Sequence, residues 1–194
     1  MTTVIIKSGN TDIATDKVEF AALMLQMLRE EALEAASSAV GTRPAIGTEW
    51  PEQGGIYLGV MRGRDGHPDY DLIVAKAESD TKLKWGAHGE DSKATSKWDG
   101  LANTRVLIEE GDHPAAEYAA GITIDGHSDF YLPAQAELML AWANAPEVFS
   151  EGWHWSSTQY SSYYAFNVDF NVGTTTIDGK DDSFRVRPVR RILR

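Results

Sequence analysis

The most regular hydrophobic pattern in the chain lies in residues 17–39, where apolar side chains recur at intervals of three and four positions. They are Phe20, Leu23, Met24, Met27 and Leu28. This spacing places all five on one face of a helix. Asp16, with Glu19 three positions later, is typical of a helix start. The apolar stripe must be buried, either on the chain's own domain or on a partner in an oligomer or assembly, and the pattern leaves both open.

Short apolar runs elsewhere predict strands. VIIKSG near the start predicts one, and Ile56–Met61 and Tyr70–Ala75 predict a hairpin whose turn is Arg64–Gly66. Gly and Pro are frequent between 41 and 55, which is typical of a linker. We therefore divide the chain into an N-terminal strand and helix for assembly or attachment (1–45), a linker (46–55) and a second domain (56–194).

The middle of the second domain has one polar segment followed by three predicted helices. Residues 79–97 are polar with little periodicity, so we expect a long surface loop. Three helices should follow: one after Asp99, one opened by Asp112 with Pro114 in its first turn, and one ending at about Asn144.

From Tyr163 onward, apolar and polar residues alternate, which predicts a half-buried strand. The inner row would be Tyr164, Phe166, Val168, Phe170 and Val172. The outer row would be Tyr163, Ala165, Asn167, Asp169 and Asn171. A partner strand at 174–177, a turn at Asp178–Gly179 and a third strand at 184–187 complete three consecutive antiparallel strands, with arginines on the outer face.

Composition narrows the function. The chain has 194 residues and a net charge of −11, so nucleic acid and anionic membrane surfaces are poor partners. Cysteine is absent, which removes disulfides and thiolate chemistry. No apolar run is long enough for a membrane span, and no basic start precedes an apolar stretch, so we expect no membrane insertion and no signal peptide.

Two local features invite a functional interpretation but have simpler ones. The pattern DGHxD occurs at 65–69 and at 125–129, and both copies fit Asp-Gly turns better than a metal site. The arginines near the C-terminus fit internal ion pairing better than an anion-binding patch. These are Arg185, Arg187, Arg190, Arg191 and Arg194.

His154 is the strongest candidate for catalysis, because Ser156 and Ser157 are close in sequence. In a strand its ring would point away from Trp153 and Trp155, so we expect it to be exposed. No nucleophile elbow, phosphate loop or dinucleotide fingerprint accompanies it. We therefore predict no catalytic residue, and keep an enzyme that uses His154 and a nearby serine as an alternative.

A binding surface is better supported by the residues between 160 and 182, which are rich in Tyr, Ser, Asn and Thr. Such residues give large contact area and adaptable hydrogen bonds. The candidate ligand-binding residues are Tyr160, Tyr163, Asn167, Asp169, Asn171, Thr174 and Thr176. A merely solvated polar face is the alternative.

Three segments carry a resemblance. They are DGHSDFYLPAQAEL at 125–138, HWSSTQYSSYYAFNVDFNVG at 154–173 and VRPVR at 186–190. In this order they resemble the Lcl C-terminal-like (DUF1566) domain, found in bacterial surface proteins and in phage and prophage proteins. The resemblance covers 54–194. Phe130 stands where the family has Trp, and Ala134 where Ser or Thr would cap a helix, a local loss of about 1 kcal/mol.

The resemblance implies an α+β fold of the C-type-lectin-like kind, with two helices and a twisted antiparallel sheet, here preceded by an N-terminal helical appendage. Its first and last strands would lie side by side, so Ile56–Val60 would neighbour Arg190–Leu193, with Trp155 in the core. The signatures of lectin calcium sites are absent, and the related formylglycine-generating enzymes depend on cysteine. The resemblance therefore implies no metal, no cofactor and no enzymatic activity.

Together these features favour a non-enzymatic binding module of a phage or prophage, associated with the tail and acting as a receptor-binding or adhesin-type protein in the virion. Its partners would be a host surface protein or glycan. The N-terminal stripe would contact other virion subunits in a homo-oligomer such as a trimer. The alternative from another class is a structural virion protein that uses the same face for subunit contacts.

Overall fold

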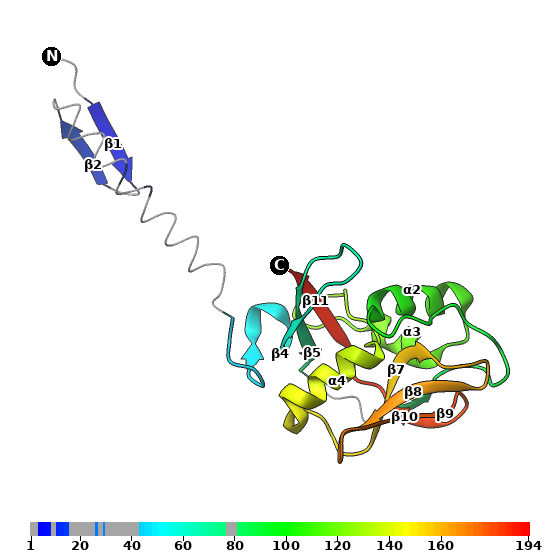
Figure 1. Ribbon diagram of the computed structural model, residues 1–194. Coiled ribbons are helices and arrows are strands. Elements are labelled where there is room, and N and C mark those ends of the chain that lie inside the picture. The colour runs from blue at the N-terminus through cyan, green and yellow to red at the C-terminus, as the bar shows by residue number, and fades with distance from the viewer. Residues whose placement is uncertain (1–3, 9–10, 16–25, 27–28, 30–42, 77–80) are drawn as a thin grey trace. The chain divides into compact units, whose positions relative to one another are not determined.

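A computed structural model describes residues 4–8, 11–15, 26, 29, 43–76 and 81–194. The chain forms two compact units, 1–42 and 43–194 (Figure 1). In the first unit, β1 (Val4–Ser8) pairs antiparallel with β2 (Thr11–Thr15), which confirms the strand predicted at VIIKSG and adds a second. The predicted apolar stripe lies outside the described residues. It comprises Phe20, Leu23, Met24, Met27 and Leu28.

The second unit is a mixed α+β fold whose described residues form three helices and two sheets. One sheet has four antiparallel strands in the order β11 (Val189–Leu193), β5 (Tyr70–Ala75), β4 (Gly55–Met61) and β3 (Glu49–Trp50). The predicted hairpin is confirmed as β4 and β5. The first and last strands are not neighbours, however, because β5 pairs on both edges and stands between β4 and β11.

The second sheet has five strands in the order β6 (Lys82–Lys84), β10 (Ser183–Arg185), β7 (Trp153–Gln159), β8 (Tyr164–Asp169) and β9 (Thr174–Gly179). The β8–β9 pair confirms part of the prediction. The third strand, β10, does not continue beside β9; it runs parallel to β7 and antiparallel to β6. The carbonyl of Lys180 accepts hydrogen bonds from the Trp85 and Gly86 amides, and so carries the chain across to β6.

Three helices pack on these sheets. The first, α2 (Gly100–Glu110), begins as predicted after Asp99, whose carboxylate accepts a hydrogen bond from the Ala102 amide at 3.0 Å. The second, α3 (Pro114–Gly121), is preceded by His113 rather than by Asp112 at its cap position. Helix α4 (Gln135–Asn144) contacts strands of both sheets, as Figure 1 shows. Two short 3-10 helices, Pro51–Gln53 and Pro146–Val148, complete the described helical residues of the second unit.

Tertiary contacts replace the missing side-chain cap of α4. The Thr158 hydroxyl accepts from the Gln135 amide at 3.1 Å, and the Lys97 carbonyl accepts from the Ala136 amide at 2.9 Å. These acceptors come from β7 and from the loop before α2. They satisfy helix amides that the Ala134 methyl group cannot, which offsets the predicted local loss.

Strand β8 is covered on both faces and is not half-buried. Its residue Ala165 belongs to the core beneath α2 and α3, whereas Val168 belongs to the core around α4. Of the predicted outer row, Asn167 is therefore fully buried. The predicted inner row fails at its two ends, where Tyr164 is 43% exposed and Val172 is 64% exposed.

Two predicted irregular segments contain folded structure. Within 79–97, the short strand β6 is followed by Trp85, which is fully buried and donates from Nε1 to the Ser156 carbonyl at 2.8 Å. Within 46–55, Trp50 is buried against Tyr57, with ring centroids 5.4 Å apart. The predicted linker is thus part of the second unit, because its tryptophan completes the packing on β4.

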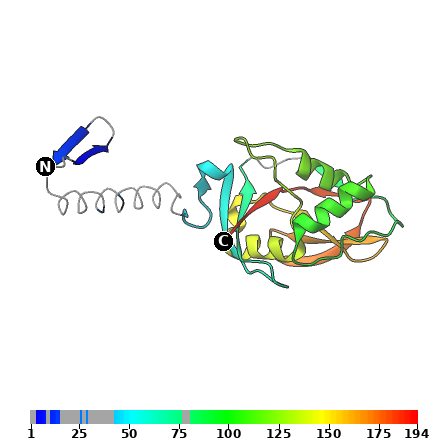
Figure 2. The ribbon, with the colours of Figure 1, turned by 90° about the horizontal axis from the view of Figure 1, so that it is seen from above.

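The two ends of the second unit meet at Asp71 on β5, a carboxylate that is only 1% exposed. Arg43 donates to it at 2.7 Å, and Arg194 lies 3.9 Å away. Figure 2 shows the C-terminus beside the cyan segment that opens this unit. One carboxylate therefore joins the first and last residues of the fold.

Candidate binding surface and pocket

The predicted binding residues do not form one surface. Asn167 is fully buried and Asp169 is 9% exposed, which contradicts the outward placement of both. The exposed residues Asn171 and Thr174 lie at the turn between β8 and β9, and Thr176 is partly exposed in mid-strand. Tyr160 and Tyr163 lie near the opposite end of β8. Because a strand rises about 3.3 Å per residue, the two ends are roughly 17 Å apart.

The polar residues near the β8–β9 turn hold the fold. Asn167 donates to the Asp178 carboxylate at 2.8 Å, and Asp169 accepts from the Asn171 amide at 2.9 Å. The turn closes at Gly173, which has a φ of 74° and lies so close to the Trp142 ring that a Cβ atom would come within 2.4 Å of it. These contacts give Asn167, Asp169 and Gly173 a structural role at the turn.

Three exposed tyrosines gather at the other end of the hairpin, and we call them the tyrosine cluster. Tyr160 is 58% exposed, Tyr163 is 50% exposed and Tyr164 is 43% exposed. The prediction placed Tyr164 in the core, but β8 begins there and its first residue extends beyond the packed region. Tyr164 therefore adds a third exposed aromatic ring to this surface.

The tyrosine cluster is held in place by its own loop and by neighbouring rings. The Tyr160 and Ser161 amides both donate to the Tyr164 carbonyl, at 2.9 and 3.0 Å. The Tyr163 ring packs on His88 with centroids 5.0 Å apart, and the Tyr160 ring packs on Phe166 at 5.4 Å. Large aromatic groups are thus both exposed and fixed, a combination that keeps the entropy cost of binding low.

A pocket of about 480 Å³ lies at the start of α4. Its wall is largely apolar: Val60, Met61, Trp98, Ala136, Met139 and Leu140. Its remaining lining residues are Arg62, Arg64, Lys97 and Gln135. We call it the Arg64–Trp98 pocket. Sequence reasoning missed it, because its walls come from the β4–β5 turn, the loop before α2 and α4, which are far apart in the chain.

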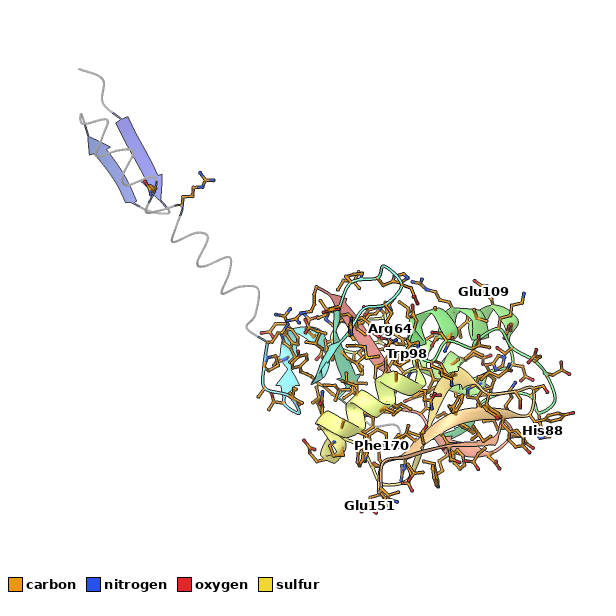
Figure 3. The ribbon with its side chains drawn as sticks, in the orientation of Figure 1. Arg64, His88, Trp98, Glu109, Glu151 and Phe170 are labelled. Atoms are coloured by element: carbon orange, nitrogen blue, oxygen red, sulfur yellow. The ribbon has the colours of Figure 1, made fainter. Side chains whose placement is uncertain are left out.

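Arg64 stacks on the Trp98 ring, with the guanidinium carbon 3.5 Å from the ring centroid. Both residues also line a second cavity of about 250 Å³, so the stacked pair forms a wall common to the two. Figure 3 shows the two side chains together at this end of the unit. Lys97 lies over the Phe166 ring, 5.2 Å from its centroid, which links the pocket to the ring beneath Tyr160.

The interior behind the pocket holds a fully buried carboxylate, Glu137. Its Oε1 accepts from the hydroxyls of Tyr70 at 2.6 Å and Tyr131 at 2.7 Å. Its Oε2 accepts from the amides of Ala134 at 2.7 Å and Gly100 at 3.2 Å. Burial raises the pKa of Glu137, although these hydrogen bonds act in the opposite direction. Four donors, from β5, from α2 and from the segment before α4, make it a structural hub.

Lys180 is a second buried charge and is fully inaccessible. Its Nζ donates to the Glu90 carbonyl at 2.6 Å and to Gln159 Oε1, and it lies 4.7 Å from the centroid of the Trp85 ring. Burial lowers the pKa of Lys180, because removal from water disfavours the ammonium form. No periodic pattern predicted the burial of this residue, because it follows a strand as an apparent turn lysine.

His154 is fully buried, which contradicts the predicted exposure. Its ring packs between Phe149, at 5.5 Å, and Phe170, at 4.7 Å, and its Nδ1 lies 3.1 Å from the Gly152 carbonyl oxygen. Both faces of β7 are covered, so alternation does not bring the ring to the surface. A substrate in solution has no direct access to this side chain.

Three of the five C-terminal arginines, Arg190, Arg191 and Arg194, pair with carboxylates as predicted, whereas Arg185 and Arg187 donate to backbone carbonyls. Arg190 donates to both Asp129 oxygens, at 2.8 and 3.0 Å, and Arg191 donates to Asp99 at 3.1 Å. Burial acts to raise the pKa of Asp129, but the hydrogen bonds and charge of Arg190 outweigh it and lower that pKa. An anion patch is therefore not formed by Arg190 and Arg191.

The two Asp-Gly pairs are turns, as predicted: Asp65 has a φ of 54° and Asp125 a φ of 50°. Within the described part of the chain, no three His, Asp or Glu side chains gather in a way that could hold a metal ion. Among the described helices, none is both long enough and apolar enough to cross a membrane.

No model of a known protein family matches the sequence, and no curated protein matches it significantly.

Proposed function

We propose that the chain is a non-enzymatic binding module of a phage or prophage particle, with a C-type-lectin-like second unit that displays the tyrosine cluster to a host surface protein or glycan. The three Lcl-like motifs support the lectin-like fold and the phage context. The α+β architecture agrees with that fold at the level of class, although it has three described helices rather than two and keeps β4 apart from β11.

The observation that carries the proposal is the tyrosine cluster. Tyr160, Tyr163 and Tyr164 are each more than two-fifths exposed, and all belong to one short loop and strand start. Rigid exposed aromatic groups are typical of recognition surfaces and of binding hot spots. Two of the predicted binding residues, Tyr160 and Tyr163, belong to it.

The test is binding of the purified full chain to a glycan array and to intact cells of a panel of bacterial strains. Tyr163→Ala combined with Tyr164→Ala should reduce binding at least tenfold while the circular dichroism spectrum stays unchanged. Ile108→Ala on α2 is the matched control, because Ile108 is also 43% exposed. Equal binding by the double variant and the control would refute the role of the cluster.

The N-terminal unit is proposed to assemble the chain into a homo-oligomer such as a trimer within the virion, through the apolar stripe of residues 20–28. Light scattering at micromolar concentration should give an oligomer for the full chain and a smaller species for Met24→Lys combined with Leu28→Lys. A monomer in both cases would refute the assembly role. Negative-stain images of the particle would separate a receptor-binding position at the tail tip from a structural position between subunits.

A further inference from the structure

The Arg64–Trp98 pocket combines an apolar wall with positive charge. Arg62, Arg64 and Lys97 line it, and no Asp or Glu does, although the chain as a whole has a net charge of −11. Among the described residues, no carboxylate lies within ion-pair distance of these three cations. Arg190 and Arg191, by contrast, pair with Asp129 and Asp99, so the three pocket cations differ from them in having no carboxylate partner in the described part of the chain.

The cationic groups are also ready to donate. Arg64 is fixed by its stack on Trp98, yet its guanidinium N–H groups donate to no described residue. An arginine held flat on an aromatic ring presents its donors with little further loss of side-chain entropy. Planar guanidinium groups suit a carboxylate, which accepts two parallel hydrogen bonds.

The apolar wall of the pocket indicates the chemical nature of the rest of an anionic ligand. Met139 is 49% exposed and Trp98 is 42% exposed, so a ligand would remove apolar surface from water. Apart from the three cations, the polar groups of the described lining side chains are the Trp98 indole N–H and the Gln135 amide, which already donates to Thr175 Oγ1 at 3.1 Å. A sugar ring, whose edge carries hydroxyl groups, would cover this apolar surface less completely than a hydrocarbon ring.

We infer that the Arg64–Trp98 pocket binds a small organic carboxylate with an apolar, ring-containing body. The carboxylate accepts hydrogen bonds from Arg64 and Arg62 and lies within the field of Lys97. The body covers Met139, Leu140 and the edge of Trp98. A volume of about 480 Å³ is suitable for such a molecule. None of the three tyrosines of the cluster lines this pocket, and the inference does not depend on the function proposed for the cluster.

The test is isothermal titration calorimetry of the full chain with 3-phenylpropionate, 3-phenylpropionamide, acetate and glucuronate. The ring carboxylate should bind, and the uncharged amide should bind at least tenfold more weakly, because it loses the charge-assisted hydrogen bonds. Acetate and glucuronate should also bind at least tenfold more weakly, since they lack the apolar body. Equal affinity for acid and amide, tighter binding of glucuronate, or no binding of 3-phenylpropionate at millimolar concentration would overturn the inference.

Variants locate the site. Arg64→Gln combined with Arg62→Gln should weaken 3-phenylpropionate binding at least tenfold, and Met139→Ser should weaken it severalfold. Arg105→Gln is the matched control, because Arg105 is an exposed arginine on α2 outside this pocket. Tyr163→Ala with Tyr164→Ala should leave this affinity unchanged, so failure of the pocket and failure of the tyrosine cluster are distinguishable. Binding that survives the double arginine change would refute the assignment.

Discussion

Two groups of charges lie at the start of α4 and behave in opposite ways. Glu137 is fully buried and accepts four hydrogen bonds from four residues. Arg62, Arg64 and Lys97, on the adjoining surface, have no carboxylate partner among the described residues. The difference follows from solvation, because an unpaired buried charge is costly whereas water stabilises an exposed one. Charges that hold the fold are satisfied internally, and charges available to a ligand are not.

The largest effect is expected at the hub. Glu137→Gln offers one oxygen and one amide group to four donors, so at least two donors lose their acceptor. We expect a loss of about 3 kcal/mol in the free energy of unfolding, measured by urea denaturation at pH 7. Glu147→Gln, at an exposed position, is the control and should change stability by less than about 0.5 kcal/mol. Similar stability of the two variants would contradict the structural role of Glu137.

Substitutions of two lysines, one buried and one exposed, test the same comparison, and the expected change in stability is intermediate. Lys180→Met removes the buried donor to the Glu90 carbonyl and to Gln159, and should cost about 2 kcal/mol. Lys97→Met removes an exposed ammonium from the pocket and should change stability by less than about 0.5 kcal/mol. Thermal unfolding of both variants at one pH measures the difference. If Lys97→Met proved the more destabilising, the division into structural and available charges would be wrong.

The smallest effect is expected at the Asp129–Arg190 pair, which joins a buried arginine to a carboxylate that is 55% exposed. After solvent screening, Asp129→Asn should cost about 1 kcal/mol at neutral pH. The pKa of Asp129 is lowered below 3.8, so its contribution is present above that value and lost as pH falls through the folded-state pKa. Urea denaturation at pH 7 and near pH 2 should show a difference between wild type and variant that shrinks with acid. A constant difference would contradict the ion pair.

Local signals in the sequence predicted the local structure. The hairpin of β4 and β5 followed from two apolar runs and an Asp-Gly turn, and α2 began at Asp99 because its carboxylate caps the helix. The position of β10 beside β7 could not be predicted in the same way, because that pairing joins residues far apart in the chain. Alternation failed at Asn167 and His154 for the same reason: other elements cover the second face of their strands.

The candidate sites also differ in whether local sequence signals predict them. Tyr160 and Tyr163 were identified because their segment is rich in Tyr, Ser, Asn and Thr, and because alternation placed Tyr163 in the outer row. Tyr164 was missed because the alternation was extended one residue beyond the packed part of β8. The Arg64–Trp98 pocket was missed entirely. Arg64 and Trp98 lie in different loops, and only their stacking in three dimensions makes one wall.

The meeting of Arg43 and Arg194 at Asp71 has a consequence for engineering. Because the chain enters and leaves the second unit at one corner, a short peptide could join the two ends without stretching the fold. New ends could then be opened in the exposed turn around Gly66, between β4 and β5. Such a circular permutant would keep all three helices and both sheets, and the closed corner would allow the unit to be inserted into a surface loop of another protein.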